Sequence, residues 1–236
     1  MKPFTVAFPL PCALEEAPHF LLEKLNIDMS KKQVMIPGSS LFYTPILQGA
    51  AEGLESIFAE HAPLTDEESK ILASHKSLFF LEFFVKSADE FKSFLLAAKK
   101  VLDAGALGVY VENSGCAWTA KAFADLTSGE VPMEAFVNVI ETSDSLFTLG
   151  LEPFGLPDLC TAVKAPLSVD ECRSVLIAAA ATIFEDGAEY ESGAKWKDED
   201  REFEFKKEAK APFSKDAPEF NAQGYARLVL RSKQKL

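Results

Sequence analysis

The sequence predicts an α+β fold in which mixed sheets are covered by helices, and three observations support this prediction. Residues 78–86 carry apolar side chains on both faces of an extended strand, which is typical of a strand inside a sheet. Residues 87–105 have apolar side chains at helical spacing and residues 107–112 form another strand, so a crossover between parallel strands is expected. Strand-like and helix-like segments also follow one another along all 236 residues.

Three helix starts are indicated by a serine or threonine placed three residues before a glutamate. In such a capping box the hydroxyl accepts a hydrogen bond from a free amide of the first turn, and the carboxylate reaches back to the cap amide. The three pairs are Thr65 with Glu68, Ser87 with Glu90, and Ser168 with Glu171. We therefore expect helices over about 66–75, 88–104 and 169–186.

The remaining elements follow from apolar periodicity and from turn residues. The further expected strands are residues 4–10, 33–36, 41–44, 136–142, 146–151, 159–164, 202–205 and 225–231. The further expected helices are residues 18–25, 46–60 and 119–126. Gly49 and Gly53 weaken the second of these helices, because glycine is unfavourable inside a helix. Residues 136–142 and 146–151 are expected to pair as a hairpin, and residues 210–224 to form a long loop.

Two segments match at a constant offset, SADEFKSFLLAA from Ser87 and SVDECRSVLIAA from Ser168. One interpretation is duplication of a strand-helix-strand unit, which gives two pseudo-duplicated ferredoxin-like halves at residues 1–130 and 131–236. The other interpretation is convergence of two capped, alanine-rich helices within a single compact unit of residues 1–236.

The charge of the chain argues against two classes of partner. It has 24 basic and 36 acidic side chains and a formal net charge of −12, which repels phosphate backbones and anionic lipid heads. We therefore expect neither nucleic acid nor a membrane as partner, and the longest apolar run near the C-terminus, residues 175–184, is shorter than the ~20 residues that span a bilayer. Residues 188–236 hold 11 basic and 10 acidic side chains, so the negative charge lies in residues 1–187.

No metal site or cofactor is expected. The four cysteines lie far apart without a C-x-x-C pair, and the three histidines are not arranged around them. The glycines fit neither G-x-G-x-x-G nor a Walker A loop, and the acidic runs lack the spacing of a calcium loop. Because so large a core needs no disulfides, we expect reduced thiols in a cytoplasmic protein.

One segment is a candidate ligand-binding site because a strand is expected to end there and a helix to begin. Exposed amides at such a junction can hold an anion. The candidate residues are Tyr110, Asn113, Ser114, Cys116 and Trp118. A cysteine at a helix start has a lowered pKa and can act as a nucleophile, whereas a buried cysteine is inert packing.

A family resemblance rests on the motif SLFTLGLEPFGLPDLC at residues 145–160, on the block from residue 78, and on the helix that ends in FEDG at residues 184–187. These segments resemble a bacterial family catalogued only as a domain of unknown function. The matching positions are turn-forming and packing residues: Thr148, Leu149, Gly150, Phe154, Gly155, Leu156, Pro157, Asp158 and Gly187. The resemblance implies a soluble bacterial α+β protein and assigns no catalytic residue.

Two functional hypotheses remain open at this point. The first is a non-catalytic module that binds a protein or small ligand, favoured by 20 phenylalanines, an acidic surface and the lack of a convergent catalytic set. The second is an enzyme that acts on a small substrate through Cys116. Residues 78–85 are expected inside a sheet, whereas the C-terminal strands are expected to form an edge hairpin that could join two copies as a homodimer.

Overall fold

The computed structural model describes residues 2–128, 133–164, 166–198, 200–208, 212–217 and 219–231. The chain divides into two compact units, Lys2–Phe136 and Val137–Leu236, and each is built around its own sheet. Both sheets carry helices, so the expected α+β class is confirmed. The boundary after Phe136 lies close to the expected division after residue 130.

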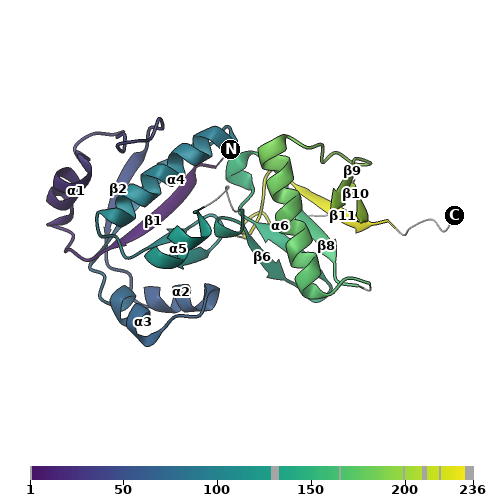
Figure 1. Ribbon diagram of the computed structural model, residues 1–236, viewed down its shortest axis with the longest axis horizontal. Coiled ribbons are helices and arrows are strands. Elements are labelled where there is room, and N and C mark those ends of the chain that lie inside the picture. Colours follow the sequence, from purple (N-terminus) through teal and green to yellow (C-terminus); the bar gives the residue numbers. More distant parts are fainter. Residues whose placement is uncertain are drawn as a thin grey trace. The chain divides into compact units, whose positions relative to one another are not determined.

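The first unit contains the elements from β1 to α5 and the 3-10 turn that follows (Figure 1). Its strands are β1 (Phe4–Leu10), β2 (Thr44–Gly49), β3 (Ser77–Phe83), β4 (Gly108–Val111) and β5 (Cys116–Thr119). Its helices are α1 (Ala17–Leu25), α2 (Leu54–His61), α3 (Asp66–Ala73), α4 (Ala88–Asp103), α5 (Ala120–Leu126) and the 3-10 turn η1 (Met133–Ala135). The strand order is β2-β3-β1-β4-β5, and each neighbouring pair is antiparallel.

Strand β3 lies inside this sheet, as its two apolar faces predict. It pairs with β1 from Phe4↔Phe83 to Leu10↔Ser77 on one side and with β2 on the other. Because β1 is antiparallel to both β3 and β4, these two strands run parallel to each other. The expected crossover of parallel strands through α4 is therefore confirmed, with β1 between them.

Phenylalanines form the core on the face of the sheet that α4 covers. The Phe4 ring lies 5.6 Å from the ring centroids of both Phe91 and Phe94 of α4, and Phe91 lies 4.7 Å from Phe136. All four side chains are fully buried, and each such burial stabilises the fold by roughly 1.5–3 kcal/mol. On the opposite face, α2 and α3 place Phe58 and other apolar side chains against the sheet.

The structure corrects the expectation for residues 33–60. The two expected short strands form only an isolated bridge between Val34 and Tyr43. Residues 46–49, expected at the start of a helix, instead belong to β2, because pairing with β3 satisfies the backbone along the whole strand. The helix begins only at Leu54, after Gly53 adopts a φ of 74° as its N-cap. The few apolar residues in this segment fit the periodicity of a helix as well as that of a strand, and pairing with the sheet stabilises the strand.

The second unit contains a six-stranded mixed sheet in the order β6-β7-β8-β11-β10-β9. Its strands are β6 (Asn138–Glu141), β7 (Ser145–Leu149), β8 (Asp158–Ala162), β9 (Lys195–Asp198), β10 (Arg201–Lys207) and β11 (Tyr225–Leu230). The long helix α6 (Val169–Asp186) packs against β6, β7, β8 and β9, and the 3-10 turn η2 spans Glu152–Phe154 (Figure 1). The expected hairpin of β6 and β7 is confirmed.

The C-terminal strands were expected to form a hairpin at the edge of a sheet, and the structure shows that they do not. Strand β11 lies between β10 and β8, parallel to β8, and β10 lies between β11 and β9. The edge is β9, a strand that the sequence analysis missed, and its exposed Lys195 and Lys197 are typical of a strand edge protected from pairing. Part of the expected loop 210–224, including Lys210, Ala211 and Pro218, lies outside the described residues.

The capping boxes at Thr65 and Ser168 form as expected, and at Ser87 the hydroxyl accepts from the amide of Glu90. The helices α4 and α6 of the two matching segments each follow a strand and lead to one parallel to it. The first sheet is antiparallel and the second is mixed, so the similarity is limited to this unit. Duplication of ferredoxin-like halves stays a prediction.

Candidate ligand-binding site

The residues singled out in the sequence come together in the hairpin of β4 and β5. Tyr110 lies in β4, Asn113 and Ser114 lie in the turn, and Cys116 and Trp118 lie in β5. The expected helix start is not at the turn, because a second strand intervenes. Helix α5 begins only at Ala120, and Thr119 caps it by accepting a hydrogen bond from the amide of Ala122.

Three of the candidate side chains, those of Asn113, Ser114 and Trp118, already have hydrogen-bond partners within the fold. Asn113 accepts from the amide of Thr5 at 2.7 Å and donates to the carbonyl of Pro3 at 3.1 Å. The Ser114 hydroxyl accepts from the amide of Cys116, and Trp118 donates Nε1–H to the carbonyl of Ala135 at 2.9 Å. These hydrogen bonds give the three side chains a structural role in the fold.

Cys116 is fully buried in β5. Burial raises the pKa of its thiol to about 12, so only about one molecule in 10⁵ would carry a thiolate at pH 7. The thiolate is the nucleophilic form of cysteine, and this environment therefore disfavours nucleophilic chemistry at Cys116.

Two histidines near helix ends also have structural surroundings. The ring of His61 packs edge-on against Trp118 with centroids 4.4 Å apart, and burial lowers the pKa of His61. Its Nε2 atom has no hydrogen-bond partner among the described residues. His75 is buried, accepts from the amide of Ala51 at Nε2 and donates from Nδ1 to the carbonyl of Leu72. Neither histidine lines the pocket of the second unit, which is described next.

A pocket lies in the second unit, where the parallel strands β8 and β11 end. Its volume is ≈ 570 Å³, which falls in the range of about 300–1,000 Å³ for small-ligand sites. The residues that line it come from β8, the loop that leads to α6, the turn and start of β10, and the end of β11: Thr161, Ala162, Lys164, Pro166, Leu167, Asp200, Arg201, Arg227, Leu228, Val229, Leu230 and Arg231. The carboxyl ends of parallel strands are a common position for a ligand crevice.

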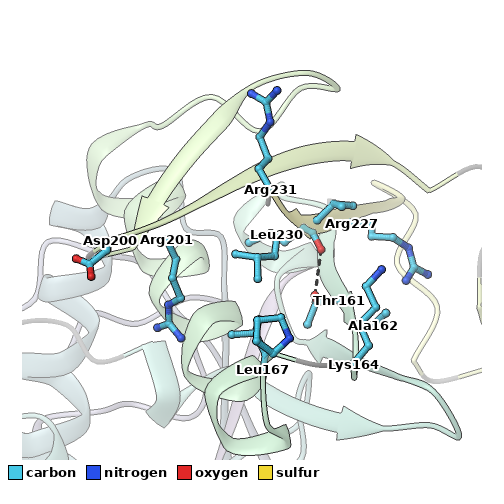
Figure 2. Close-up of a pocket in the computed structure, with 12 residues that line it drawn as sticks. Thr161, Ala162, Lys164, Leu167, Asp200, Arg201, Arg227, Leu230 and Arg231 are labelled. Atoms are coloured by element: carbon cyan, nitrogen blue, oxygen red, sulfur yellow. Dashed lines mark hydrogen bonds between the residues drawn. The ribbon is translucent and has the colours of Figure 1, made fainter. Parts of the chain in front are cut away.

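The pocket exists because β11 extends further than its pairing with β8. The ladder between the two strands ends at Arg227↔Cys160, whereas the ladder of β11 with β10 continues to Leu230↔Phe203. Directly beyond the shorter ladder, the Thr161 hydroxyl donates to the carbonyl of Leu228 at 3.0 Å (Figure 2). The side chain thus replaces the next backbone partner of the strand.

The interior of the pocket is apolar. Figure 2 shows Leu167 and Leu230 toward its middle, and Leu228 and Val229 also line it. Leu167 and Leu228 are buried, whereas Leu230 is partly exposed at the opening. Such a surface can take the apolar body of a ligand out of water.

Cationic side chains surround this apolar interior, and three of them are held by carboxylates. Arg201 contacts Glu171 at 3.4 Å and Asp198, Arg227 donates from Nε to Glu208 at 2.6 Å, and Arg231 lies 3.1 Å from Glu202 and 3.7 Å from Glu204. These ion pairs fix the guanidinium groups and offset their charge.

Lys164 differs from the three arginines. It is exposed at the pocket, on the same side as Arg227 in Figure 2, and no carboxylate of the described residues forms an ion pair with it. The side-chain hydrogen bond that Arg227 forms with a described residue uses Nε, so within the described residues its two terminal nitrogens are open to a ligand. An anionic group would find its charge complement at this side of the pocket.

A buried carboxylate lies at the opposite end of β8. Asp158 accepts hydrogen bonds from the Thr148 hydroxyl, the Leu151 amide and the Asn221 side chain, at 2.9, 3.3 and 2.8 Å. Burial raises the pKa of Asp158 to about 7, although these three donors favour its ionised form. The cluster ties β8 to the loop before β11 and is not part of the pocket lining.

The pocket was missed in the sequence because its residues come from segments far apart along the chain. The alternation of Arg227, Val229 and Arg231 with leucines was recognised as a strand, but nothing local indicates that its edge is open. Within the described parts of the chain, no group of histidine, cysteine and carboxylate side chains is placed to hold a metal ion. The same described residues contain no helix that is long and apolar enough to span a membrane.

Comparison with known proteins adds no relative. No protein-family model, no curated protein and no solved structure matches this chain. The resemblance of residues 78–187 to a bacterial family of unknown function therefore stays a prediction, and the function has to be argued from the site itself.

Proposed function

We propose that this protein is a non-catalytic binding module whose pocket at the ends of β8 and β11 takes a ligand with an apolar body and an anionic group. The observation that carries the proposal is the combination of Leu167, Leu228 and Leu230 inside the pocket with the ammonium of Lys164 at its side, which forms no ion pair with any described residue. Apolar walls with a few placed polar groups are the usual composition of a small-ligand site.

The surroundings of the pocket support binding rather than catalysis. The nearest hydroxyl, that of Thr161, is engaged with the Leu228 carbonyl, and the guanidinium groups are engaged with carboxylates. Catalysis through Cys116 is the alternative, and the burial and raised pKa of that thiol weigh against it. The chain as a whole is acidic, so an anion would be recognised locally by the cations of this pocket.

Octanoate is a suitable probe because it combines a carboxylate with an apolar chain. We expect it to bind more tightly than butanoate, since each further buried methylene contributes about 0.8 kcal/mol. The variant Lys164→Gln should weaken octanoate binding about threefold to tenfold, the effect of a partly solvated charged hydrogen bond. Calorimetric titration measures both effects.

The matched control is Lys99→Gln, which removes the same charge from an exposed position on α4 of the other unit. It should bind octanoate as the unmodified protein does. If octanoate does not bind, or if both variants weaken it equally, the pocket is not the anion-binding site that we propose.

A reducing compartment also belongs to this proposal. All four cysteines are free thiols, and Cys116, Cys160 and Cys172 are buried. This supports a cytoplasmic location, where thiols stay reduced. Mass spectrometry of the protein isolated under thiol-blocking conditions would contradict it by finding disulfides.

A further inference from the structure

The pocket has a feature that a simple anion site does not require, which is an open strand edge. The direction in which each residue of β11 points its backbone groups follows from two hydrogen bonds to β10. The amide of Arg231 donates to the backbone carbonyl of Glu202 at 2.9 Å, and the amide of Glu208 donates to the carbonyl of Tyr225 at 3.0 Å. The backbone groups of Arg231 and Tyr225 therefore point toward β10. Because the register is constant and the direction alternates from residue to residue, the backbone groups of Leu230 point away from β10.

On that other side, β8 is too short to supply a backbone partner for Leu230. The described ladder of β8 with β11 ends at Arg227, and the chain after Ala162 leaves the sheet toward α6. The amide and the carbonyl of Leu230 thus point into the space in which β8 would have continued, and that space is the pocket. An exposed edge of this kind is a template for one more strand.

We propose that the ligand of this pocket is the C-terminal end of an extended peptide, which pairs with Leu230 as a short strand and places its terminal carboxylate beside Lys164. This inference rests on the proposed function, because it names the ligand class of the same pocket. The peptide backbone would continue the line of β8, and its side chains would contact the leucines of the pocket.

The charges determine the direction of the peptide. Strand β8 runs parallel to β11, so the end of the peptide that meets the last residues of β8 also meets Lys164. A peptide parallel to β11 would bring its N-terminal end to this lysine, whereas an antiparallel peptide brings its carboxylate there. Opposite charges attract and like charges repel, and the antiparallel arrangement is therefore the favoured one.

The probe is the peptide N-acetyl-Thr-Val-Ile-Leu with a free C-terminal carboxylate, because β-branched residues suit an added strand. Its C-terminal amide has the same side chains without the charge, and we expect it to bind about tenfold more weakly. With the Lys164→Gln variant, the acid and the amide should bind alike, and Lys164→Arg should largely restore the difference. Equal affinities of acid and amide for the unmodified protein would overturn the assignment of the carboxylate.

Backbone pairing is tested by two further peptides, methylated either at the Val and Leu amides or at the Thr and Ile amides. Alternate amides of a strand point to opposite edges, so only one of these peptides should lose its affinity. The amide of Leu230 should also exchange about tenfold more slowly with the acid peptide bound. Equal loss or equal retention by the two methylated peptides would exclude strand addition.

The outcomes separate this inference from the function on which it rests. If octanoate binds in a manner sensitive to Lys164 and the peptide does not bind, the pocket is an anion site and the peptide assignment is wrong. If neither probe binds, both proposals are wrong.

Discussion

Thr161 donates its hydroxyl to the carbonyl oxygen of Leu228 at 3.0 Å, one residue beyond the point at which the backbone ladder between β8 and β11 ends. Both residues are buried, so this bond satisfies a carbonyl that would otherwise lie in an apolar wall. It joins the two strands at the opening of the pocket and determines where the open edge of β11 begins.

The variant Thr161→Val removes this hydroxyl and keeps the shape of the side chain. We expect it to lower the free energy of unfolding by about 1–3 kcal/mol, because the buried carbonyl of Leu228 loses its donor. Chemical denaturation measures this change. Thr161→Ser retains the hydroxyl and is the control, which should lose clearly less; an equal loss in both variants would mean that the methyl group, and not the bond, is responsible.

Asp158 should make stability depend on pH with a sign opposite to that of a paired carboxylate. Burial raises its pKa in the folded protein to about 7 from the ordinary value of 3.8, so the native state holds a proton that the unfolded chain releases between these values. Stability is therefore highest below pH 4 for this group and falls as pH rises toward 7, by a loss on the order of a few kcal/mol.

Asp158→Asn isolates that contribution, because the amide cannot ionise. The difference in unfolding free energy between the variant and the unmodified protein should shift in favour of the variant as pH increases from 5 to 8. Denaturation at several pH values gives this difference. A difference that stays constant over the range would show that the pKa of Asp158 is not raised.

Cys116 should not react with a thiol reagent in the folded protein. It is fully buried and its pKa is raised, whereas Cys12 is partly exposed and is the cysteine most open to attack. We expect Ellman's reagent to label Cys116 only after unfolding, with mass spectrometry of peptides identifying the site. Rapid labelling of Cys116 in the native state would revive the enzymatic alternative.

Deleting residues 188–236 should give an insoluble or unfolded second unit. The deletion removes β9, β10 and β11, which are three of the six strands, and exposes Leu159 and the apolar face of α6. Solubility and circular dichroism test this expectation. A folded, soluble product would mean that the first part of this unit holds a complete core, and would return the C-terminal strands to a role in assembly.

The sequence predicted a homodimer through an edge hairpin of the C-terminal strands, but β10 and β11 lie inside the sheet and leave only β9 at this edge. Strand β10 pairs with both β9 and β11, and β11 pairs with β10 and, over Tyr225–Arg227, with β8, while the remaining edge at β9 is short and carries exposed lysines. The mass of the protein in solution at high concentration measures whether copies associate. A monomer at all concentrations would exclude the dimer.

The sequence by itself determined the elements whose signals are local. The capping boxes at Thr65 and Ser168, the doubly apolar strand β3 and the polar turn between β6 and β7 all formed where short-range spacing predicted them. Each depends on residues within a few positions of one another. The α+β class followed from these elements.

Only the tertiary structure decided which partners the strands have. Residues 44–49 became a strand because β3 offers a backbone partner, and β11 entered the sheet interior because it pairs with a strand far earlier in the chain. The pocket depends on the lengths of two such ladders, which differ at Leu230, and no local pattern encodes that difference. Residues 110–118 were expected to be a strand end followed by a helix start, but they form a hairpin, and long-range hydrogen bonds to Pro3, Thr5 and Ala135 give it a structural role.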